Sequence, residues 1–105
     1  MKENKYICIW YSWGEVESPV KVPEDKDAFD YMVELALKEV GIVIVEESKR
    51  ATIWTNEDDN GNTIIVLNYG WSDDYCYYKI FDNEEEADKF MMILWKMKSD
   101  ISNIS

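Results

Sequence analysis

The stretch ATIWTNEDDNGNTIIVLNY, residues 51–69, decides the fold class. Two runs rich in β-branched residues, 51–56 and 63–69, flank a polar segment that contains the dipeptide Asn60-Gly61. Asn-Gly is the strongest short hairpin signal, because both residues tolerate the positive φ angles of a tight turn. The stretch therefore predicts two antiparallel strands that follow one another directly.

Three further segments have strand character. Residues 6–13 (YICIWYSW) and 75–81 (YCYYKIF) are dense in aromatic side chains, and residues 42–47 (IVIVEE) form a short β-branched run. Such residues are enriched in strands because they pack well on a pleated surface. The chain therefore predicts about five strands, joined mostly by short turns.

A first helix is predicted over 29–40, where apolar residues form one continuous stripe at helical spacing. Asp25 or Asp27 can cap its start, and Gly41 suits the left-handed position just past its end. The stripe consists of Phe29, Met32, Val33, Ala36, Leu37 and Val40.

A second helix is predicted after Asp82, which forms a capping-box pattern with Glu85 three residues later. The tail over 99–105 is expected to fray, because it carries small polar residues at the chain end. The apolar stripe of this helix consists of Ala87, Phe90, Met91, Leu94 and Trp95.

These elements predict a single α+β domain spanning 1–105, in the order β-α-β-β-β-β-α. Consecutive strands with short connections favour an antiparallel sheet, and we expect the two helices to pack on one face of it. However, the strands are apolar on both sides, whereas a sheet covered on one side should alternate apolar with polar residues. Either the sheet curls around its own core, or apolar surface is left over for an interaction.

The charge of the chain is strongly negative. Twenty-two Asp and Glu residues face eleven Lys and Arg residues, which gives a formal charge of -11. This charge repels nucleic acid and anionic membranes and complements a basic protein, although it also serves simply to keep an aromatic-rich protein in solution.

With no ~20-residue apolar run and no signal segment, a cytoplasmic location is expected. Cys8 and Cys76 are expected to be reduced and buried.

The residues needed for familiar catalysis are missing, so we expect no enzyme activity, cofactor or metal. The sequence has no histidine, two distant cysteines and four glycines without a phosphate-loop pattern. Residues 56–61 begin like a calcium loop, but Leu67 stands where the bidentate glutamate is required. Glu47-Ser48-Lys49 matches half of a metal-dependent nuclease motif. A carboxylate-metal enzyme therefore remains an alternative.

In size, charge, aromatic content and lack of catalytic residues, the chain resembles the small acidic inhibitors carried by bacteriophages. These include anti-CRISPR proteins and other DNA mimics. The chain is similar in the same respects to bacterial immunity proteins that neutralise basic nuclease toxins. The resemblance includes no sequence motif. It implies a cytoplasmic inhibitor that binds a basic, nucleic-acid-handling protein, and the alternative is a homodimeric structural or regulatory module.

Two kinds of side chain are expected to bind the partner. Acidic groups steer the encounter of two proteins, and aromatic anchors supply most of the affinity. The predicted partner-binding residues are the acids Asp27, Asp30, Glu34, Glu57, Asp58, Asp59, Asp73 and Asp74, and the aromatics Trp13, Trp54, Trp71 and Tyr75.

Overall fold

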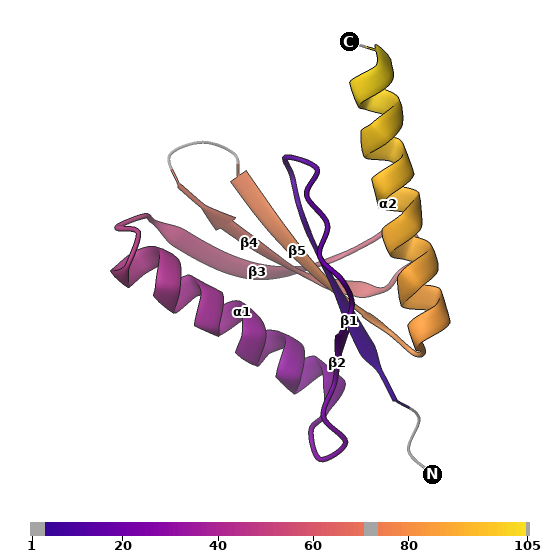
Figure 1. Cartoon of the computed structure of the whole chain (residues 1–105). Helices are drawn as coiled ribbons and strands as arrows, with labels where there is room; N and C mark the ends of the chain where they lie inside the picture. The colour runs from indigo at the N-terminus through magenta and orange to yellow at the C-terminus, as the bar shows by residue number, and fades with distance from the viewer. Residues whose placement is uncertain (1–3, 71–73, 105) are drawn as a thin grey trace.

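The computed structural model describes residues 4–70 and 74–104, with 97–104 as backbone alone. These residues form one five-stranded antiparallel sheet and two helices (Figure 1), which confirms the predicted α+β class. The strands lie in the order β2-β1-β5-β4-β3. Their bounds are β1 Tyr6–Tyr11, β2 Val20–Lys21, β3 Ala51–Glu57, β4 Thr63–Tyr69 and β5 Asp74–Phe81, and the helices are α1 Ala28–Val45 and α2 Glu84–Ile104.

The predicted Asn-Gly hairpin is confirmed. Strands β3 and β4 pair without interruption from Ala51 opposite Tyr69 to Glu57 opposite Thr63. Gly61 has a φ of 80°, the left-handed conformation that favours glycine in such a turn. Local chemistry alone therefore determines this part of the sheet.

The strand predicted over 42–47 is wrong, because α1 continues through Gly41 to Val45. Val43 lies on the same side of the helix as Met32 and Ala36, and all three are buried against the sheet. This packing outweighs both the helix-breaking tendency of glycine and the strand propensity of the β-branched run. The fifth strand is instead β2, in a segment for which no strand was predicted, so the order is β-β-α-β-β-β-α.

Gly41→Ala is expected to stabilise the fold by about 1 kcal/mol, because alanine restricts the unfolded chain and favours a helix interior. Gly41 is exposed, and a Cβ placed there meets nothing within 4 Å. Gly61→Ala is the matched control: its surroundings are equally open, but its positive φ disfavours alanine. Urea unfolding compares the two variants, and a loss of stability in Gly41→Ala would contradict the helical assignment.

The start of α2 differs from the predicted capping box. The Oδ1 atom of Asn83 accepts a hydrogen bond of 2.8 Å from the backbone N–H of Glu86. Asn83, rather than Asp82, therefore caps this helix. The helix extends to Ile104, through most of the segment 99–105 that the sequence predicted as a frayed tail. At α1, by contrast, Asp27 is the N-cap, one of the two residues expected.

The register of the strands places the two helices on opposite faces of the sheet, which corrects the expectation that both pack on one face. Side chains alternate along a strand, so Ile7 and Ile9 of β1 point to the opposite side from Cys8. Ile7 and Ile9 share a core with Met32 of α1, whereas Cys8 Sγ lies 3.4 Å from the carbonyl oxygen of Ala87 in α2. Since the strands are apolar on both sides, one helix on each side covers more of them.

We name the two sides of the sheet after these helices. The α1 face holds the main buried core, where Met32, Ala36 and Val43 pack on the sheet. The sheet residues of this face are Ile7, Ile9, Tyr11, Ala51, Ile53, Thr55, Ile65, Leu67, Tyr69, Cys76, Tyr78 and Ile80. Those of the α2 face are Tyr6, Cys8, Trp10, Thr52, Trp54, Asn56, Ile64, Val66, Asn68, Tyr75, Tyr77, Lys79 and Phe81.

Candidate functional site

The α2 face is only partly covered. Helix α2 packs on β1 and β5, where the ring of Phe90 lies 5.1 Å from Trp10 and 5.0 Å from Phe81 between centroids. From there the C-terminal turns of α2 extend past the strands (Figure 1). On β3, at the other side of this face, Trp54 and its neighbours Thr52 and Asn56 are exposed. The open half of the α2 face is therefore the first candidate for a binding surface.

A continuous row of aromatic rings crosses this face. Trp10, Tyr77, Val66 and Trp54 are directly opposite one another on four neighbouring strands. Trp10 stacks on Tyr77 at 5.3 Å between ring centroids, and Tyr77 stacks on Tyr75 at 6.1 Å. Tyr75 in turn meets Trp54 edge to face at 6.1 Å. We call Trp10, Tyr77, Tyr75 and Trp54 the aromatic row.

The row is a preorganised surface. Each ring contacts the next, so few side-chain rotamers remain to be fixed when a partner binds. Burial raises the pKa of Tyr77, and the neighbouring Tyr75 raises it further. Trp54, at the open end of the row, is 42 % exposed. Large, rigid, amphipathic rings of this kind dominate the affinity of protein interfaces.

A shallow hollow adjoins the row between α2 and the β3–β4 hairpin tip. Its apolar wall comes from α2, where Ile93 is exposed beside Phe90. Its polar wall comes from Asn60 and Asn62 at the hairpin tip. Lys79, two residues from Tyr77 on the same side of β5, forms part of its floor. The surface open to a partner therefore includes this hollow as well as the row.

Lys79 has a structural role in this hollow. It is only 7 % exposed, and its ammonium group forms an ion pair with Asp58 from the hairpin tip. The same ammonium lies over the rings of Phe81 and Phe90, at 5.2 and 5.1 Å from their centroids. Hydrogen bonds from Lys79 and from the backbone N–H groups of Asn60 and Asn62 lower the pKa of Asp58. Asp58, one of the acids predicted to bind a partner, thus anchors the hairpin to β5.

The predicted aromatic anchors fall on two different surfaces. Trp54 and Tyr75 lie together in the aromatic row on the α2 face. Trp13 lies in the turn after β1, where it stacks on Tyr11 at 4.7 Å and meets Tyr69 edge to face at 6.1 Å, on the α1 face. It is 49 % exposed, but it does not belong to the row. Trp71 lies outside the described residues.

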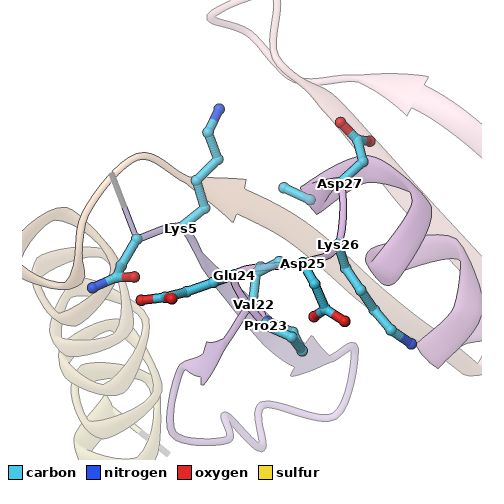
Figure 2. A pocket seen from close by; sticks show the side chains of 9 residues that line it. Lys5, Val22, Pro23, Glu24, Asp25, Lys26 and Asp27 are labelled. Carbon is cyan, nitrogen blue, oxygen red and sulfur yellow. The ribbon is translucent and has the colours of Figure 1, made fainter. Parts of the chain in front are cut away.

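The predicted acids on α1 do not form one surface with the row. Asp27 caps the helix by accepting from the N–H of Asp30, and Glu34 forms an ion pair of 3.0 Å with Lys26. A hollow at the N-terminal end of α1 includes Asp27, but Figure 2 shows its charged side chains pointing apart rather than toward a common centre. The residues lining this hollow are Asn4, Lys5, Val22, Pro23, Glu24, Asp25, Lys26, Asp27 and Ala28.

The remaining acids lie at the ends of β-strands. Glu57 and Asp59 are exposed at the hairpin tip, on either side of Asp58. Asp74 begins β5 and is half-buried, with its backbone oxygen accepting from Asn68 Nδ2 at 3.1 Å. Asp73 lies outside the described residues. The described acids are thus distributed around the molecule, and many of them cap or pair with other groups.

The two cysteines have no reactive geometry. Cys8 and Cys76 are both free and buried, on opposite faces of the sheet. Burial raises the pKa of Cys8 to about 11 and that of Cys76 to about 12, so both remain thiols. Among the described residues, no three cysteine or carboxylate side chains gather in a way that would hold a metal ion. Glu47, the first residue of the Glu-Ser-Lys sequence that matches half of a nuclease motif, forms an ion pair of 3.0 Å with Lys49.

Sequence reasoning missed Trp10 and Tyr77 as members of the row. Their strands are apolar on both faces, and only the register shows that these two residues align with Trp54. Their alternation with the core residues Ile9 and Tyr78 was a usable signal.

No protein family, curated protein sequence or solved structure matches the chain. Among the helices in the described residues, neither is long and apolar enough to cross a membrane.

Proposed function

We propose that this protein is a non-enzymatic binding protein that inhibits a basic, nucleic-acid-handling protein in the cytoplasm, and that the aromatic row is its contact surface. The observation that carries the proposal is the row itself, which joins Trp10, Tyr77, Tyr75 and Trp54 in one chain of ring contacts. An open face of connected aromatic rings offers the central anchors that protein interfaces use.

The charge of the protein supports a basic partner. A net charge of -11 raises the rate of encounter with a positively charged surface and disfavours nucleic acid itself. The exposed acids Glu57 and Asp59 lie at the hairpin tip, next to the hollow beside the row. Acids beside an interface affect the association rate, whereas central aromatic rings supply most of the affinity. A basic nuclease is one member of this partner class.

The proposal is tested by comparing three immobilised baits in nuclease-treated host extract. Wild type is expected to retain a basic protein that the double variant Trp54→Ala/Tyr75→Ala loses, because truncation of each hot-spot ring costs about 2 kcal/mol of binding. Trp13→Ala, an exposed aromatic residue off the row, is the matched control and should retain it. Mass spectrometry identifies the retained protein, and thermal melting verifies that all three baits are folded.

Two properties of the captured complex decide the partner class. Binding is expected to weaken steeply as salt rises, because screening removes the electrostatic attraction. Double-stranded DNA added to the washed complex, after the nuclease is removed, should release the retained protein if that protein handles nucleic acid. Retention that is the same for the double variant, or that is unaffected by salt, would exclude this function.

A further inference from the structure

The free edge of the sheet has an unusual composition. Strand β3 is the last of the five strands, and among the described residues no other strand pairs with its outer side. Arg50 O accepts from Gly70 N at 3.1 Å, and Asp58 N donates to Asn62 O at 3.0 Å, so even-numbered residues face β4. The outward N–H and C=O groups are therefore those of the odd-numbered residues Ala51, Ile53, Thr55 and Glu57.

This edge lacks the devices by which proteins normally prevent edge-to-edge pairing. Such devices are lysines, prolines, bulges and very short strands. Strand β3 is seven residues long, its pairing with β4 is unbroken, and Glu57 is its only charged residue. The edge is therefore open to the addition of another strand.

Apolar side chains flank the edge on both faces. On the α2 face Trp54 is exposed beside it. On the α1 face, helix α1 runs along β3 (Figure 1), and Phe29, Leu37 and Ile44 are 40 %, 53 % and 48 % exposed. These three residues occupy one flank of the helix.

That flank of α1 overlooks the β3 edge. Glu39 lies on the other flank, where burial and the charges of Glu47 and Glu17 raise its pKa. Its own charge raises the pKa of Tyr11 of β1, Tyr78 of β5 and Tyr69 of β4, so it lies over these strands rather than over β3. With Met32, Ala36 and Val43 facing the sheet, the flank opposite Glu39 is the one toward β3.

We propose that β3 pairs with β3 of a second copy, antiparallel and about a two-fold axis at Trp54, so that the two sheets become one. This register places all four outward-facing residues of each strand in hydrogen-bonded pairs, with Ala51 opposite Glu57 and Ile53 opposite Thr55 of the second copy. The two Trp54 rings then adjoin on one face, and the exposed flanks of the two α1 helices meet on the other.

The charges along the edge favour a second copy of this chain. Arg50 lies just before β3, whereas Glu57, Asp58 and Asp59 lie at its other end. Antiparallel pairing therefore brings Arg50 of each copy to the acidic end of the other. Between these ends the strand is uncharged, so the repulsion between two chains of charge -11 is weakest there. The two aromatic rows would form one continuous surface through Trp54.

The oligomeric state in solution tests this inference. Light scattering across a concentration series is expected to show a rise from 12.4 kDa to twice that mass. Added salt should favour the dimer, because it screens the repulsion between like-charged copies. Thr55→Pro removes an outward N–H and should leave a folded monomer, since proline is tolerated on the open side of an edge strand. Thr55→Val keeps that N–H and should still dimerise.

A disulfide tests the register. In the proposed pairing the two residues 54 form a non-hydrogen-bonded pair, close enough for Trp54→Cys to cross-link under mild oxidation. The two residues 56 are separated by about 13 Å, so Asn56→Cys should stay uncross-linked. The native cysteines are buried and do not compete.

Each failure has a distinct meaning. A chain that is monomeric up to millimolar concentration, a Thr55→Pro variant that remains dimeric, or cross-linking at 56 rather than 54 would overturn the inference. The function proposed above does not depend on it, because Thr55→Pro leaves the aromatic row intact and should capture the same basic partner as wild type.

Discussion

Asp58→Asn is expected to lower the melting temperature by roughly 10 °C or more, because it leaves a buried ammonium group without its counter-charge. Lys79 is almost fully buried, and its ammonium lies between the Asp58 carboxylate and the rings of Phe81 and Phe90. Asparagine keeps the Oδ1 atom that accepts from the N–H groups of Asn60 and Asn62. The variant therefore removes the ion pair while it preserves the turn, and circular dichroism during heating measures the loss.

Two further variants isolate the cause. Asp59→Asn removes the neighbouring exposed acid and should leave the melting temperature nearly unchanged. Adding Lys79→Met to Asp58→Asn should recover much of the loss, because the uncompensated charge is then gone. Equal melting of Asp58→Asn and Asp59→Asn would show that the ion pair does not hold the hairpin to β5.

The same ion pair has a defined dependence on pH. The pKa of Asp58 is lowered in the folded protein, mainly by the hydrogen bond from Lys79. A lowered pKa means that the contribution is present above the ordinary carboxyl pKa and is lost as the pH falls through the lowered value. The difference in stability between wild type and Asp58→Asn should therefore shrink in acid.

The parts of the fold that the sequence predicts well are those in which local chemistry decides. The β3–β4 hairpin follows from Asn60-Gly61, and the start of α1 follows from the capping carboxylate of Asp27. The end of α1 does not follow in this way. Gly41 and the run after it favour a helix stop and a strand, but the burial of Val43 against the sheet reverses both preferences.

Long-range geometry explains what the sequence left unresolved in the site. The apolar character of both strand faces left open whether they would be covered, and in the structure Trp54 is exposed and in contact with Tyr75. The alignment of Trp10 and Tyr77 with them depends on strand order, because β1 pairs with β5 rather than with β3. Nothing local encodes that order. The ion pair between Asp58 and Lys79 does not follow from local charge patterns either, since the two residues are twenty-one positions apart.

Met32→Ala and Leu37→Ala separate the two sides of α1, which the sequence places in a single apolar stripe. Met32 is fully buried in the core, so truncation should cost about 3 kcal/mol of unfolding free energy through lost contacts and a residual cavity. Leu37 is 53 % exposed on the flank beside β3, so the same truncation should cost the monomer less than about 0.5 kcal/mol. Urea unfolding at low protein concentration measures the unfolding free energy of both variants.

At high protein concentration Leu37→Ala should additionally weaken self-association, because the Leu37 side chain meets the second copy. If the two variants lost similar amounts of unfolding free energy at low concentration, α1 would be rotated about its axis relative to this structure. No exposed flank of the helix would then be available to a second copy.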